Sequence, residues 1–89
     1  MTVFLVQNQH SNSIAIGYQA GHNVTGHANT CIGMQALFSS ASGGYNTAVG
    51  RQALYSATSG GENSALGYAA GYNTTTGVRN VAFGNSAHQ

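Results

Sequence analysis

The side chains that could carry out catalysis are few in this sequence of 89 residues. Glu62 is the only acidic residue, so no pair of carboxylates exists for general acid–base chemistry. Cys31 is the only cysteine, which excludes an intrachain disulfide. The histidines show neither the helical nor the cysteine-linked spacing of a metal site. They are His10, His22, His27 and His88. These residues predict a protein that is not an enzyme and holds no metal or cofactor.

Two of these residue types leave a second interpretation open. His22 and His27 could approach each other across one turn and share a metal ion, although polar turn residues are the simpler interpretation. Cys31 could be a nucleophile, but it stands where a repeated pattern otherwise has alanine, which favours packing. The paired glycines at 43–44 and 60–61 precede neither a lysine nor a helix, so they indicate turns rather than a phosphate-binding loop.

The charge of the chain is very low. Only Arg51, Glu62 and Arg79 are charged, which is 3% of the residues, whereas about 25% is usual. A net charge of +1 supplies no basic surface for nucleic acid. The apolar start of the chain is too short to span a membrane. We therefore expect neither nucleic acid binding nor membrane insertion.

A unit of about 17 residues repeats along most of the chain. An asparagine recurs at steps of 17 residues and predicts a ladder of amides: Asn12, Asn29, Asn46, Asn63 and Asn80. A glycine follows in every unit and predicts a turn: Gly17, Gly33, Gly50, Gly67 and Gly84. The glycine steps are 16, 17, 17 and 17, so the first unit has one irregularity. The repeat region therefore comprises residues 12–89. Residues 1–11 are expected to form a lead-in strand that caps the repeat region or links it to another subunit.

The stretch before each glycine alternates between large and small side chains. One face carries the column Ile16, Ile32, Val49, Leu66 and Phe83, and the other carries Ala15, Cys31, Ala48, Ala65 and Ala82. This period of two predicts a strand, with the large column as the core ladder. We expect a second short strand after each glycine. The fold class is then all-β, a parallel β-solenoid of about five rungs of 17 residues each.

Stacked rungs account for the missing charge, because like charges about 4.8 Å apart repel by ~1 kcal/mol even in water. Neutral amides can instead form ladders, as expected for Gln19, Gln35 and Gln52. Glu62 and Arg79 lie one unit apart and can pair. An aromatic column at Phe38, Tyr55 and Tyr72, with His22 in the first unit, favours packing over sugar binding. The varied residues after the glycines are candidates for surface contact: Tyr18, Met34, Arg51 and Tyr68.

The segment 46–56, Asn-Thr-Ala-Val-Gly-Arg-Gln-Ala-Leu-Tyr-Ser, resembles the repeats of phage tail-fibre and spike proteins. The segment 12–17 is similar to the head repeat of trimeric autotransporter adhesins. The resemblance implies a left-handed parallel β-roll. It also implies an intertwined or side-by-side homotrimer with small residues at the contacts between chains. The aliphatic residue before each glycine would then fill the chain's own core.

The expected function is that of a stiff trimeric segment, shaft or tip, of a tail fibre in a virion. Its partners would be further copies of itself, with a cell-surface glycan or protein receptor as a candidate. The alternatives are a bacterial surface adhesin and a self-assembling extracellular filament subunit. An ice-binding solenoid is a further class, since low charge with threonine and alanine columns suits it. Against it, the column Thr30, Thr47 and Ser64 is short and lies on the face expected to point inward.

Overall fold

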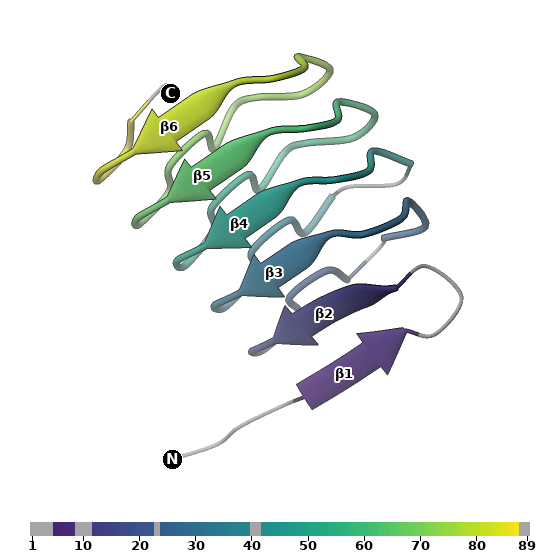
Figure 1. The fold of residues 1–89 in the computed structure, drawn as a ribbon. Coiled ribbons are helices and arrows are strands. Elements are labelled where there is room, and N and C mark those ends of the chain that lie inside the picture. The colour runs from purple at the N-terminus through teal and green to yellow at the C-terminus, as the bar shows by residue number, and fades with distance from the viewer. Residues whose placement is uncertain (1–4, 9–11, 23, 40–41, 88–89) are drawn as a thin grey trace.

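The computed structural model describes residues 5–8, 12–22, 24–39 and 42–87. They form six strands: β1 (Leu5–Asn8), β2 (Ser13–Ile16), β3 (Thr30–Ile32), β4 (Thr47–Val49), β5 (Ser64–Leu66) and β6 (Val81–Phe83). The strands make one sheet in sequence order (Figure 1). Strands β2 to β6 are parallel, and the chain coils back between them. The all-β class and the parallel β-solenoid are thus confirmed, with five parallel strands and about four turns of the coil.

The strand β1 runs antiparallel to the rest of the sheet. It pairs with β2 from Leu5 opposite Ile16 to Asn8 opposite Ser13. It therefore occupies the edge of β2 that faces away from β3, as Figure 1 shows at the purple end of the chain. An exposed strand edge offers unpaired N–H and C=O groups to other chains. Strand β1 removes that opportunity from β2. The remainder of the expected lead-in segment, residues 1–4 and 9–11, lies outside the described residues.

The pairing register corrects one member of the predicted asparagine ladder. Ile14 is paired with Thr30, a step of 16 residues, whereas all later partners are 17 apart. Ser13 consequently lies in line with Asn29, and the Asn29 N–H donates to the Ser13 Oγ at 3.1 Å. Asn12 falls outside the ladder and is exposed. The prediction for Asn12 is wrong because the shorter first unit shifts its place by one residue.

The face of the sheet that points into the coil is the alanine face. Cys31, Ala48 and Ala65 are at most 1% exposed, whereas Leu66 is 48% exposed and Phe83 65%. The predicted core ladder of Ile16, Ile32, Val49, Leu66 and Phe83 is therefore wrong in direction: in this chain those side chains point outward. The physical reason is that the coil is too thin to hold the large side chains between its two walls. The molecule is only 14 Å across in its thinnest direction, and the alanines at 36, 53 and 70 fill the opposite wall.

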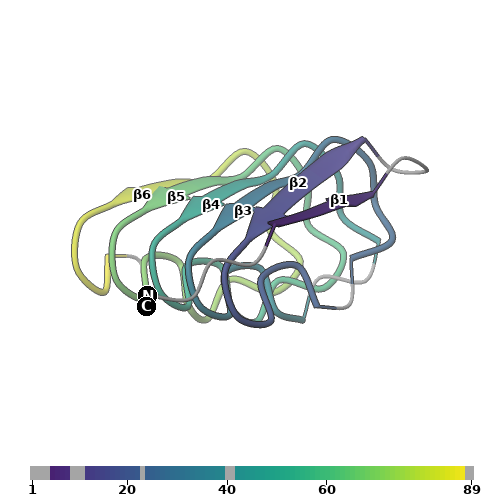
Figure 2. The same cartoon turned by 90° about the horizontal axis from the view of Figure 1, so that it is seen from below.

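The segment after each glycine is a series of turns, so the expected second strand is wrong. Two residues in each of the four segments that follow Gly17, Gly33, Gly50 and Gly67 adopt a left-handed backbone, for example Gln35 with φ 59° and Leu37 with φ 54°. Such residues interrupt the alternation that a strand requires. Leu37 and Leu54 are completely buried there and are the largest side chains of the interior. In Figure 2 the strands form one side of the coil and these turns close the other.

Backbone hydrogen bonds join successive coils outside the sheet as well. The Leu37 N–H donates to the Ala53 carbonyl at 2.8 Å, and the Leu54 N–H donates to the Ala70 carbonyl at 2.9 Å. Buried backbone groups need such partners, because an unpaired one costs as much as a lost hydrogen bond. Each coil therefore serves as the template for the next one over its turns as well as over its strand.

Candidate functional site

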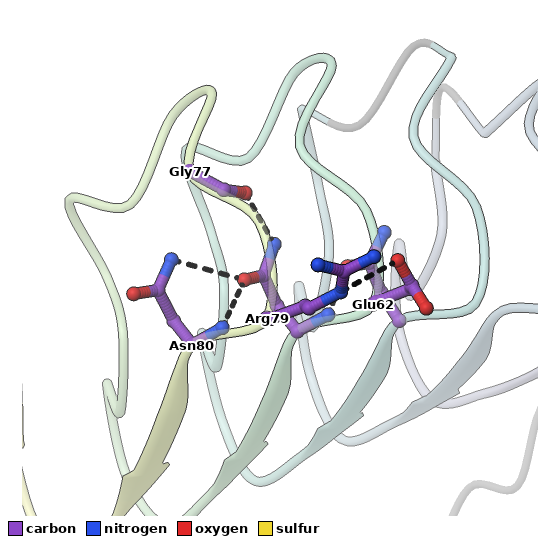
Figure 3. A network of polar contacts seen from close by, with 6 residues as sticks. Glu62, Gly77, Arg79 and Asn80 are labelled. Atoms are coloured by element: carbon purple, nitrogen blue, oxygen red, sulfur yellow. Dashed lines mark hydrogen bonds and ion pairs between the residues drawn. The ribbon is translucent and has the colours of Figure 1, made fainter.

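Inside the coil, the asparagine that precedes each of β3, β4 and β5 binds the next coil with both ends of its amide. The Asn46 Oδ1 accepts the N–H of Asn63 at 3.0 Å, and the Asn46 Nδ2 donates to the Gly60 carbonyl at 3.1 Å. Asn29 makes the same two bonds one coil earlier. Asn29, Asn46 and Asn63 are at most 1% exposed. Figure 3 shows the last step of this ladder. The Asn63 Oδ1 accepts from the N–H and the Nδ2 of Asn80, and the Asn63 Nδ2 donates to the Gly77 carbonyl.

The glycines that end the strands approach each other closely. Gly17, Gly33, Gly50, Gly67 and Gly84 all have φ between 118° and 130°. Residues other than glycine rarely adopt such a backbone conformation. A Cβ added at Gly50 would lie 2.5 Å from the carbonyl oxygen of Gly67. Gly17, Gly33, Gly50 and Gly67 therefore serve two needs at once, the turn itself and the close stacking of one turn on the next, whereas a Cβ at Gly84 would meet nothing within 4 Å.

Two side-chain ladders run along the outside of the turns. The Gln35 Nε2 donates to the Gln19 Oε1 at 2.9 Å, and the Gln52 Nε2 donates to the Gln35 Oε1 at 3.0 Å. The next coil has Ala69 in this place, so the amide ladder does not extend there.

The second ladder is aromatic, with nearly parallel rings. The ring centroids of His22, Phe38, Tyr55 and Tyr72 follow one another at 5.0, 5.0 and 4.8 Å. Each inner ring has both faces covered by its neighbours. This arrangement agrees with packing and leaves only the ring edges of Phe38 and Tyr55 for a ligand.

The outward side of the sheet is mostly apolar and carries no charge, with three hydroxyl residues at its centre. We call it the outer sheet face. It consists of two columns along the coil: Ile14, Thr30, Thr47, Ser64 and Val81, and beside them Ile16, Ile32, Val49, Leu66 and Phe83. Exposed fractions reach 47% at Ile14, 58% at Val81 and 65% at Phe83. Monomeric soluble proteins rarely expose a contiguous apolar patch of this kind unless it is an interaction site.

The candidates for surface contact lie along one margin of the outer sheet face. Tyr18 is 54% exposed, Met34 38% and Tyr68 48%, and Arg51 is exposed too. The Arg51 guanidinium carbon lies 5.9 Å from the centroid of the Tyr68 ring, within the range of a cation–π contact. Contact of these residues with another molecule stays a prediction.

On the other margin, charged side chains interrupt the apolar surface. The Arg79 Nε lies 3.3 Å from the Glu62 Oε1, as expected for residues one unit apart (Figure 3). The two side chains are 78% and 55% exposed, so solvent screens the pair and it adds little stability. Tyr45, 68% exposed, precedes Glu62 by one unit. The outer sheet face therefore ends at these residues on this side.

The groups suited to catalysis do not converge. Among the described residues, no three His, Cys, Asp or Glu side chains lie close enough to hold a metal ion. His22 is stacked on Phe38. His10 and His88 lie outside the described residues. Cys31 is 1% exposed and packs among the inward alanines, and burial raises the pKa of its thiol to about 12. In the described ranges, no helix is long and apolar enough to cross a membrane.

The Cys31 thiol predicts a pH dependence of stability. The unfolded chain loses this proton near pH 9.0, but the folded chain holds it to about pH 12. Folding then requires reprotonation, so stability should fall as pH rises between these values, by up to about 1.4 kcal/mol per pH unit. Chemical denaturation at several pH values measures this slope in the wild type and in Cys31→Ala. The difference between the two slopes is the contribution of the thiol, because every other titratable group is the same in both proteins. The Ala variant should lack this part of the slope, and equal slopes would contradict the prediction.

Comparisons with models of protein families, with curated proteins and with solved structures find no match for this chain. The interpretation of the site therefore rests on the residues themselves. Sequence reasoning missed the outer sheet face. A signal for it was present, because alanine recurs both before the glycines and three residues after them, which leaves a coil too thin for large inward side chains.

Proposed function

We propose that this protein is a structural fibre segment that assembles as a homotrimer through its outer sheet faces. The single observation that supports the proposal is the apolar, charge-free face itself. Burying a Val, Leu, Ile or Phe side chain completely stabilises an assembly by about 1.5–3 kcal/mol. The two columns offer seven such side chains in each chain. A closed ring of three identical faces would cover them all without leaving an open interface.

In this assembly the alanine face is the interior of each chain and the large residues meet between chains. This is the reverse of the arrangement expected from the resemblance, in which small residues make the contacts. The rest of the proposal follows the resemblance to phage tail fibres. A left-handed coil of five rungs forms a stiff shaft or tip of the virion, and the margin with Tyr18, Met34, Arg51 and Tyr68 remains free for a glycan or protein receptor. The same rod would serve in a bacterial surface adhesin or an extracellular filament.

Light scattering after gel filtration tests the assembly. The wild type should elute with three times the chain mass of 9.1 kDa. Leu66→Asp should give a folded monomer, because the Leu66 side chain is half exposed in the single chain but would be buried among the three faces. Thr76→Asp is the matched control, since Thr76 is exposed outside the sheet. It should remain trimeric. A monomeric wild type, or a trimeric Leu66→Asp, would refute the proposal.

Ice binding is a second candidate because one observation now favours it. The column Thr30, Thr47 and Ser64 points outward, not inward as expected, which removes one of the two objections to this function. The other remains, since the column is short and continues as Ile14 and Val81. A regular, uncharged array of hydroxyl and methyl groups on a sheet is what such a surface requires. Thermal hysteresis of a dilute solution decides the matter. Its loss in Thr47→Tyr would support ice binding, and its absence in the wild type would dismiss it.

A further inference from the structure

Tyr55 and Tyr72 form the last pair of the aromatic ladder. Their rings are parallel, and one lies almost directly over the other along the coil axis. Their centroids are 4.8 Å apart and their planes differ by 1°. Both side chains are half-buried. The backbones beneath them are held together, because the Ser56 N–H donates to the Tyr72 carbonyl at 3.1 Å and the Leu54 N–H donates to the Ala70 carbonyl. Equivalent atoms of the two phenols therefore face each other at nearly the distance between coils.

We propose that this pair is a site of oxidative tyrosine cross-linking, which joins two successive coils by a carbon–carbon bond. A one-electron oxidant, such as a haem peroxidase with hydrogen peroxide, removes one electron and one proton from each phenol. The unpaired electron of each radical is shared with the ring carbons next to the oxygen. One such carbon of each ring forms the new bond, and the hydrogens of those carbons move to the oxygens. Two electrons and two protons leave in total, and one peroxide becomes two waters.

The geometry favours this pair over the other tyrosines. All five tyrosines lie in the described part of the chain, and Tyr55 with Tyr72 is the pair whose rings stack on each other. Radical coupling is normally limited by the encounter of two radicals. Holding both rings in contact makes the step intramolecular, with a large gain in effective concentration. On its other side Tyr55 stacks on Phe38, which carries no phenol, so Tyr55 has Tyr72 as its one stacked tyrosine partner.

The consequence is a covalent link between positions 17 residues apart in sequence. Such a link closes a loop of the unfolded chain and leaves the stacked coils in place. The proposal concerns one chain and does not rest on the trimer.

The test uses the full chain with a photo-excited ruthenium complex and persulfate, a one-electron oxidant small enough to reach half-buried phenols. Cleavage after arginine and after Glu62 separates residues 52–62, which carry Tyr55, from residues 63–79, which carry Tyr72. Mass spectrometry should find these two peptides joined and two hydrogens lighter than their sum. The yield should be at least roughly tenfold higher in the folded chain than in guanidinium. Tyr55→Phe and Tyr72→Phe should each abolish the product, and both keep the ring that packs in the column.

Tyr68→Phe is the matched control, because Tyr68 lies in the same peptide as Tyr72 but outside the stack. It should leave the yield unchanged. A mixture of isotopically labelled and unlabelled chains should give no mixed product. Equal yields in the folded and unfolded chain, a product that survives in Tyr72→Phe, or mixed products as abundant as unmixed ones would each overturn the proposal.

Discussion

Replacing Asn46 by alanine is expected to destabilise the fold by roughly 2–6 kcal/mol, since each buried group left without a partner costs ~1–3 kcal/mol. The change leaves two such groups, the N–H of Asn63 and the carbonyl of Gly60. A protein of this size has a total stability of only about 5–15 kcal/mol. Denaturation by urea, followed by circular dichroism, measures the loss, and the variant should unfold at a clearly lower urea concentration than the wild type.

Two further variants make this prediction specific to the ladder. Asn46→Ser should recover part of the loss, because a serine hydroxyl already accepts the Asn29 N–H at Ser13. Asn12→Gly should change the stability by less than about 0.5 kcal/mol, since exposed positions tolerate change and glycine suits the φ of 54° at Asn12. If Asn12→Gly destabilised the protein as much as Asn46→Ala, the pairing that puts Ser13 in line with Asn29 would be wrong.

Replacing Gly50 by alanine is the second change for which we expect a large effect. The φ of 128° costs an alanine about 1–3 kcal/mol. The added Cβ would lie 2.5 Å from the Gly67 carbonyl oxygen and 2.7 Å from its carbon. Those are backbone atoms, so relief requires the two coils to separate, at a further cost of about 1–3 kcal/mol. We expect Gly50→Ala to lose several kcal/mol in the same denaturation experiment.

A graded series separates the backbone strain from the collision. Gly84 has a similar φ of 118°, but nothing lies within 4 Å of a Cβ there, so Gly84→Ala should show the strain alone. Gly17 is intermediate, with its nearest neighbour at 2.9 Å from the added carbon. The loss of stability should increase from Gly84 to Gly17 to Gly50. An equal loss at all three positions would show that the turn conformation matters and the stacking does not.

The two faces of the sheet have different roles: the inward face stabilises the fold, and the outward face is available for association. The inward side holds alanine, cysteine and asparagine, and it specifies how one coil lies on the next. The outward side holds large apolar residues whose burial requires something outside the chain. This separation makes the predictions independent of one another. Asn46→Ala and Gly50→Ala should destabilise the folded chain, whereas Leu66→Asp should leave its stability largely unchanged and alter only its assembly.

Much of the fold follows from particular residues of the sequence. The spacing of the glycines predicts the parallel stacking of the coils. The alternation before each glycine predicts short strands with alanine on one side and large residues on the other. Glu62 and Arg79, one unit apart, predict the ion pair that joins their coils. Each of these inferences depends only on the periodicity and on local backbone preferences.

The direction of the two faces, in contrast, was not decided by the alternation. A period of two divides the residues into two sets but does not say which set points inward. That depends on the distance to the opposite wall of the coil, which the left-handed residues Gln35 and Leu37 and their repeats determine by closing the turn tightly. The place of Asn12 was likewise decided by strand pairing, because the first unit has a step of 16 residues, which brings Ser13 and not Asn12 in line with Asn29. The sequence by itself therefore determined that a repeat stacks and what each coil contains. The tertiary structure alone decided which side is buried, because burial depends on the space left between walls that lie far apart in the chain.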